Sequence, residues 1–217
     1  TDPDNGSATE ISSSTVLNRT PNLSSVTISP DLDVTSSTTL NCTSASDDPD
    51  NEALTTAYQW LGGGSQLGTG ASIVLAPSMV QPGDTVQCRA TVTDPSGAED
   101  SNQASVDIVN IDPVATTLTI TPSVIYNDST VTCNVAGTDA DNQTLTESYQ
   151  WRIGGVLIGN TQSLTLSSLT ASVGDELECT GTVTDVSGGN DTLVDSIVID
   201  NRVPTVSGVT ILPTSPT

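Results

Sequence analysis

The chain has 217 residues and a formal net charge of −22, with 26 acidic residues, four basic residues that are all Arg, and no His. Nucleic acids and anionic lipids are bound through basic surfaces, so this charge argues against both as partners. The absence of His and Lys excludes imidazole metal sites, His-based triads and Schiff-base chemistry, and the few aromatic residues argue against a glycosidase cleft. We therefore expect a protein that is not an enzyme.

No apolar run approaches the roughly 20 residues that span a bilayer, so we expect no membrane insertion in this segment. The first residues are polar and acidic and show no signal-peptide pattern, so any secretion signal or anchor is expected elsewhere. The acidic composition favours solubility and the binding of cations.

The chain contains two copies of one pattern. Two Cys and one Trp recur after 91 residues, separated by 18 and 28 residues in each copy: Cys42, Trp60 and Cys88, then Cys133, Trp151 and Cys179. A period of this length is that of a small domain. We therefore predict a tandem array of domains.

Each copy is predicted to consist of β-strands. In the first copy, short stretches with apolar residues at every second position occur in chain order at 26–28, 40–42, 58–60, 86–92 and 106–108. Clusters of turn-forming residues separate them at 47–51, 62–64, 81–84 and 94–97. No helical periodicity competes, and about seven strands per copy predict a β-sandwich.

The repeat also predicts the domain boundaries, because an Asn and a Pro three residues later recur at 18–21, 110–113 and 201–204. We expect the last turn and strand of a preceding repeat at 1–18, complete repeats at 19–110 and 111–201, and the first strand of a following repeat at 202–217. Such ends fit a segment of a longer array, or strands that complete sandwiches in neighbouring subunits.

The cysteines predict disulfides rather than zinc or redox chemistry, because they form one regularly spaced pair per copy without any Cys-x-x-Cys spacing. Disulfides persist in oxidising compartments, so we expect an extracellular or cell-surface protein. A bridge that closes a loop of 46 residues would stabilise each small domain by roughly 4 kcal/mol.

The order Cys, Trp, Cys resembles the core of immunoglobulin-like sandwiches. The resemblance covers both copies and implies bridges between the two sheets, Cys42 to Cys88 and Cys133 to Cys179, with a Trp packed on each. Val86 and Leu177 stand where antibody-like members carry a Tyr two residues before the second Cys. The motifs Tyr-x-Trp and Thr-Val-Thr-Asp are similar to immunoglobulin-like and PKD-like repeats of microbial surface proteins or filaments, bacterial or archaeal.

Acidic loops suggest a calcium site, because 48–52 and 139–142 place oxygen ligands at alternate positions of a turn. In an immunoglobulin-like topology these loops lie near the incoming linker and the last turn. The predicted ligands are Asp48, Asp50, Asp112, Asp139, Asp141 and Asp185. The alternative is that Asp and Asn serve only as turn formers. No other cofactor is expected.

Seven Asn-x-Ser/Thr sequons make N-linked glycans a second expectation. The candidate sites are Asn5, Asn18, Asn22, Asn41, Asn127, Asn142 and Asn190. The alternative is an unmodified polar surface.

These features favour a structural role, as part of an extracellular filament or stalk of linked immunoglobulin-like domains that associates with, or continues into, further copies of the same repeat. The alternatives are an adhesin or cell-surface binding module, and spacer repeats in a larger secreted protein. Fold alone does not decide among them.

Overall fold

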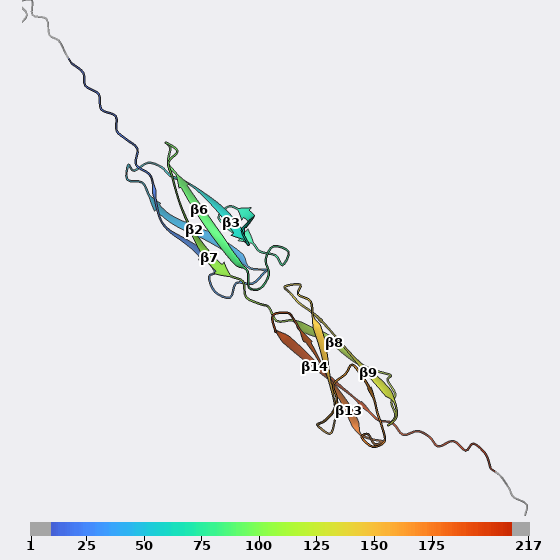
Figure 1. Ribbon diagram of the computed structural model, residues 1–217. Coiled ribbons are helices and arrows are strands. Elements are labelled where there is room, and N and C mark those ends of the chain that lie inside the picture. The colour runs from blue at the N-terminus through green and yellow to red at the C-terminus, as the bar shows by residue number, and fades with distance from the viewer. Residues whose placement is uncertain (1–9, 210–217) are drawn as a thin grey trace, which may run out of the picture. The chain divides into compact units, whose positions relative to one another are not determined.

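The computed structural model describes residues 10–209, and the chain divides into two compact units, residues 1–109 and 110–217 (Figure 1). We call them unit 1 and unit 2. Within the described residues, each unit contains seven strands. Residues 10–209 contain no helix that is long and apolar enough to cross a membrane.

Unit 1 is a sandwich of two antiparallel sheets. One sheet has three strands in the order β1-β2-β5, and the other has four in the order β4-β3-β6-β7. The strands are β1 (Asn22–Ser29), β2 (Thr39–Asp47), β3 (Thr55–Gly62), β4 (Ser65–Thr69), β5 (Ser72–Val74), β6 (Thr85–Thr93) and β7 (Glu99–Asp107).

Unit 2 repeats this topology, with sheets in the order β8-β9-β12 and β11-β10-β13-β14. The strands are β8 (Val114–Thr121), β9 (Thr130–Thr138), β10 (Thr146–Ile153), β11 (Val156–Gly159), β12 (Ser163–Thr165), β13 (Glu176–Thr184) and β14 (Asn190–Val198). In both units the second, third and sixth strands carry Cys, Trp and Cys.

The predicted alternation of apolar residues is confirmed where strands face the core. In β6, Val86, Cys88, Ala90 and Val92 are each fully buried, and the residues between them are more exposed. Successive side chains of a strand point to opposite faces, so this spacing turns one face of β6 toward the opposite sheet.

A disulfide and a Trp join the two sheets of each unit. Cys42 on β2 bonds Cys88 on β6, and Cys133 on β9 bonds Cys179 on β13. Each Trp is fully buried and donates its indole N–H to a backbone oxygen, at 2.9 Å in unit 1 and 2.8 Å in unit 2. The fold is therefore all-β, as tandem immunoglobulin-like seven-stranded sandwiches with one disulfide each.

The chain enters and leaves each sandwich at opposite ends. In unit 1 it enters before Asn22, which pairs with Asp47 at the last residue of β2, and it leaves after Asp107, which pairs with Thr85 at the first residue of β6. We call these the entering end and the leaving end. The entering end also carries the loop 48–54 and the turn 94–98.

The segments outside the sandwiches were predicted to be parts of neighbouring repeats. Residues 10–21 and 201–209 contain no strand, and residues 1–9 and 210–217 lie outside the described residues. The assignment of 1–18 and 202–217 to further repeats, and the boundary at residue 110, remain predictions.

Candidate cation site

Acidic side chains gather at the entering end of unit 1, where three segments meet. The loop 48–54 follows β2, the turn 94–98 joins β6 to β7, and the segment 18–21 leads into β1. Hydrogen bonds join the incoming segment to both of the others, from Asn18 to Asp94 and from Arg19 to Asp50. This end therefore brings together residues far apart in sequence.

Asp48 organises the loop through one of its two carboxylate oxygens. Its Oδ1 accepts the backbone N–H of Asp50 at 2.7 Å and of Glu52 at 3.3 Å, which closes a turn over the side chain. The other oxygen, Oδ2, is buried and has no hydrogen-bond partner. Asp48 is only 9% exposed, so this carboxylate lacks the water that would normally solvate it.

Glu52 and Asp94 complete a group of three carboxylates with Asp48. One oxygen from each side chain lies within 4.8 Å of an oxygen from each of the others. Glu52 Oε2 is also buried without a partner. Asp94 is satisfied, because its Oδ1 accepts the N–H of Ala98 and its Oδ2 accepts the Asn18 amide, both at 2.8 Å.

The surroundings act in opposite directions on two of these groups. Burial raises the pKa of Glu52, and the charges of Asp94, Asp48 and Asp50 raise it further. The hydrogen bond from Asn18 lowers the pKa of Asp94, against the effect of burial. Of these two groups, Glu52 is the one whose negative charge the surrounding protein disfavours.

Asp50, a predicted calcium ligand, contacts the incoming segment. Its Oδ2 accepts the backbone N–H of Arg19 at 2.7 Å, and its Oδ1 accepts the Arg19 Nε at 2.8 Å and Nη2 at 2.7 Å. The guanidinium also donates to the carbonyl of Pro49. Arg19 lowers the pKa of Asp50 through these hydrogen bonds. The structure therefore gives Asp50 a role in holding the chain as it enters the sandwich.

Unit 2 builds the same loop with different side chains. Asp139 Oδ1 accepts the N–H groups of Asp141 at 2.9 Å and Gln143 at 3.0 Å, and Asp139 Oδ2 is buried without a partner. Gln143 stands where unit 1 has Glu52, and its amide exchanges hydrogen bonds with the Ser187 hydroxyl at 2.9 and 3.2 Å.

Three other predicted ligands of unit 2 contact the incoming segment or belong to it. The fully buried Asp141 accepts the N–H of Ile111 at 2.7 Å. The Asn110 amide nitrogen donates to Asp185 at 2.9 Å and to Asp112 at 3.2 Å, so it links these two carboxylates. The structure thus places Asp112, Asp139, Asp141 and Asp185 at one end of unit 2, and their role as calcium ligands remains a prediction.

Sequence reasoning did not select Glu52 and Asp94 as ligands. Asp94 follows from the repeat, since it lies 91 residues before the predicted Asp185. Glu52 continues the alternate spacing of Asp48 and Asp50. No equivalent signal shows that Arg19 contacts Asp50.

The sequons differ in how free their amides are. The side-chain amides of Asn18 and Asn22 donate hydrogen bonds to Asp94 and Asp47, whereas Asn41 on β2 is exposed and its amide makes no such bond within residues 10–209. A glycan replaces one hydrogen of the amide nitrogen, so Asn41 is the better placed acceptor. Asn127, Asn142 and Asn190 lie in turns or at a strand start, and Asn5 lies outside the described residues.

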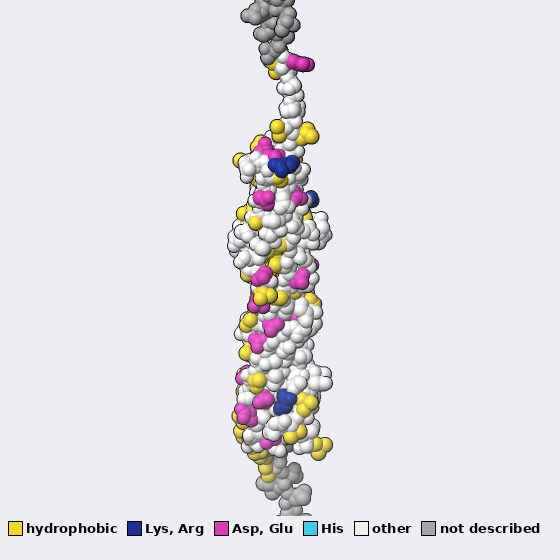
Figure 2. Space-filling model, turned by 90° about the vertical axis from the view of Figure 1, so that its left-hand side faces the viewer, with side chains coloured by type: hydrophobic (Ala, Val, Ile, Leu, Met, Phe, Trp, Pro, Cys, Tyr) yellow, Lys and Arg dark blue, Asp and Glu magenta, His cyan; other side chains and the backbone are white. Residues whose placement is uncertain are grey.

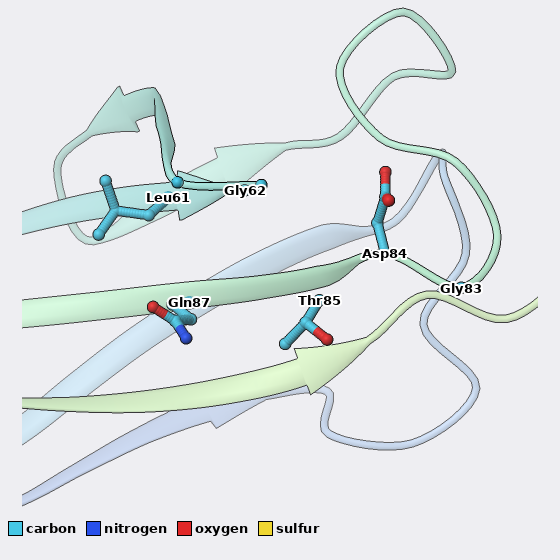
Figure 3. Close-up of a pocket in the computed structure, with 8 residues that line it drawn as sticks. Leu61, Gly62, Gly83, Asp84, Thr85 and Gln87 are labelled. Atoms are coloured by element: carbon cyan, nitrogen blue, oxygen red, sulfur yellow. The ribbon is translucent and has the colours of Figure 1, made fainter.

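A shallow pocket of about 410 Å³ opens at the leaving end of unit 1, between the β3–β4 hairpin and the turn before β6 (Figure 3). Its lining includes Leu61, Asp84, Thr85 and Gln87. An equivalent pocket of about 340 Å³ occurs in unit 2, lined by residues of the β10–β11 hairpin and the turn before β13. Its recurrence shows that the pocket arises from the shared geometry of the repeat.

No protein-family model and no curated protein matches the sequence. Solved structures match at low identity and low TM-score. Three N-terminal domains of the bacteriophage RB49 outer capsid protein Hoc share 13% identity over 84% of this chain and 71% of that one, with a TM-score of 0.31. The mouse nectin-like molecule 4 ectodomain shares 14% identity over 88% and 67%, with a TM-score of 0.35.

The extracellular cadherin domains 1–5 of protocadherin gamma B2 share 12% identity, over 85% of this chain and 40% of that one, with a TM-score of 0.36. These superpositions are loose. The assignment of each unit to the immunoglobulin-like sandwiches therefore rests on its own strand order and disulfide.

Proposed function

We propose that this chain is a structural segment of an extracellular filament or stalk built from tandem immunoglobulin-like domains. The observation that carries the proposal is the opposite placement of the entering and leaving ends in each sandwich. A domain that receives the chain at one end and releases it at the other adds its own length to an array.

Both ends of each sandwich hold the chain firmly. At the leaving end of unit 1, Gly83 N–H donates to Ile108 at 2.8 Å and Val109 N–H donates to Val34 at 2.7 Å. Unit 2 has the equivalent bonds from Gly174 to Ile199 at 2.8 Å and from Asp200 to Ile125 at 2.8 Å. The chain is therefore hydrogen-bonded to its own sandwich up to the leaving end of each unit.

The chemistry of the chain supports an extracellular structural role. The two disulfides indicate an oxidising compartment. Figure 2 shows acidic side chains spread over the viewed face with few basic ones among them, which agrees with the net charge of −22. Such a surface keeps repeated domains soluble, and glycans at the exposed sequons would add to that protection. The resemblance to microbial surface proteins rests on sequence motifs alone.

Electron microscopy of the protein isolated from its native source tests the proposal. We expect strings of beads whose spacing matches one sandwich, joined end to end. Discrete particles that bind a carbohydrate or a protein ligand would favour the adhesin instead. A single globular body at the end of a short string would favour spacer repeats in a larger secreted protein.

A further inference from the structure

The two units differ in charge at their equivalent acidic ends. Unit 1 places three carboxylates within 4.8 Å of one another, and two of their oxygens, Asp48 Oδ2 and Glu52 Oε2, are buried without partners. Each buried oxygen without a partner carries a desolvation cost that a bound cation would offset. In unit 2 the corresponding unpartnered oxygens are one carboxylate oxygen, Asp139 Oδ2, and the neutral amide oxygen of Asn110.

We propose that unit 1 binds one divalent cation of the calcium type through Asp48, Glu52 and Asp94, and that the equivalent end of unit 2 binds it much more weakly. The proposal is independent of the proposed function, because it concerns a site within a single sandwich.

The spacing of the oxygens suits one calcium ion. Calcium binds oxygen at 2.3–2.6 Å, so two oxygens on opposite sides of one ion are separated by about 5 Å. The separations of up to 4.8 Å among Asp48, Glu52 and Asp94 lie within that limit. Only oxygen ligands are offered, which favours a hard cation over zinc or copper.

The hydrogen bonds leave these oxygens free for a cation. Asp48 Oδ1 holds the loop, so Oδ2 remains. Asp94 uses one lone pair of each oxygen for Asn18 and Ala98, and a carboxylate oxygen has a second lone pair. The nearby cation Arg19 is engaged by Asp50 and Pro49. The charge of the three carboxylates is therefore left for an ion.

Unit 2 lacks two of these features. Gln143 replaces Glu52, which removes a negative charge, and its amide is paired with Ser187. The Asn110 amide nitrogen donates to Asp185 as the Asn18 amide does to Asp94 in unit 1, so the difference between the two ends is the missing charge and the paired side chain at residue 143. Among residues 10–209, only the group in unit 1 brings three acidic side chains within this spacing.

Calorimetric titration of the full-length, disulfide-bonded chain with CaCl₂ tests the proposal. We expect one strong site in the unaltered chain. Glu52→Gln gives unit 1 the chemistry of unit 2 and should weaken binding by about tenfold or more, since a charged ligand is lost. Gln143→Glu should add a second site.

The matched control is Asp31→Asn, which removes one charge from an exposed position at the leaving end of the same unit. It should leave the titration unchanged. Equal weakening by Glu52→Gln and Asp31→Asn would show that calcium acts only as a diffuse counterion and would overturn the proposal. Unchanged binding in Glu52→Gln would overturn it as well, and thermal melting in chelator verifies that each variant is folded.

Discussion

The entering ends of the two units show how one loop shape can carry two different charges. Both loops begin with an Asp that accepts two backbone N–H groups, and both use the Asp two residues later to hold the incoming chain. They differ at the next alternate position, where unit 1 has Glu52 and unit 2 has Gln143. The shared residues determine the shape of the loop, so a single substitution can change the charge of the end without changing the fold.

Disulfide removal should have the largest effect and should be equal in the two units. Each bridge closes a loop with a sequence separation of 46, so each contributes about 4 kcal/mol by loop entropy. We expect the pair Cys42→Ala and Cys88→Ala to lower the melting transition of unit 1 in calorimetry, and the corresponding pair in unit 2 to lower its own by a similar amount. A simultaneous shift of both transitions would show that the units do not melt independently.

The cores of the two units differ in the room they leave at residue 181, and the substitution Gly181→Ala tests this difference. An added Cβ would overlap Leu118 Cδ1 and would lie 2.8 Å from Val135 Cβ, whereas unit 1 carries the fully buried Ala90 at the equivalent position. Gly181→Ala should therefore destabilise unit 2 by about 1–3 kcal/mol in denaturant unfolding, because it overpacks the core.

The compensating change is visible in unit 1, where Val26 stands at the position of Leu118. Leu118→Val in the Gly181→Ala background should recover part of the lost stability, because it relieves the contact with Leu118 and leaves that with Val135. If the double variant is no more stable than the single one, the explanation by volume exchange fails.

Asp141→Ala should lower the free energy of unfolding of unit 2 by about 1 kcal/mol, because it leaves the Ile111 N–H without its acceptor. The matched change in unit 1, Asp50→Ala, should cost less, because Asp50 is more exposed than the fully buried Asp141 and water can replace it. Urea unfolding of both variants measures the difference. A larger loss for Asp50→Ala would mean that Arg19 contributes more than its exposed position indicates.

Acid should produce the smallest difference between the units. The hydrogen bond from Arg202 holds the pKa of Asp128 below its ordinary value of 3.8. A lowered pKa adds stability above pH 3.8, which is lost as the pH falls through the value in the fold. Thermal melting from about pH 6 to about pH 2 should therefore show a loss in unit 2 that depends on Arg202, and unit 1 should show its own loss because the pKa values of Asp50 and Asp94 are also lowered. Arg202→Gln should reduce the loss in unit 2 and leave the loss in unit 1 unchanged; an unchanged loss in unit 2 would assign it to other carboxylates.

The fold was predictable because its signals are local and repeated. The spacing of Cys42, Trp60 and Cys88 indicated the sandwich, and the alternation in β6 indicated which side chains face the core. The acidic end was predictable only in part. Asp48 and Asp139 are in the predicted loops, but the direction of each oxygen depends on the turn and on the incoming segment. The contact of Arg19 with Asp50 joins residues about 30 positions apart, and a sequence pattern does not show it.

The disulfide that joins the sheets of each unit also limits how far the protein can lengthen under tension. In unit 1 the chain between Cys42 and Cys88 is closed by the bridge, so a pulling force can extend only the segments outside it. At about 3.4 Å per extended residue, the sequence separation of 46 between the bridged cysteines corresponds to roughly 150 Å of contour length that a pulling force cannot extend in each unit. A string of such domains would therefore lengthen by a short step each time a domain unfolds, because about half of that domain stays inside its disulfide loop.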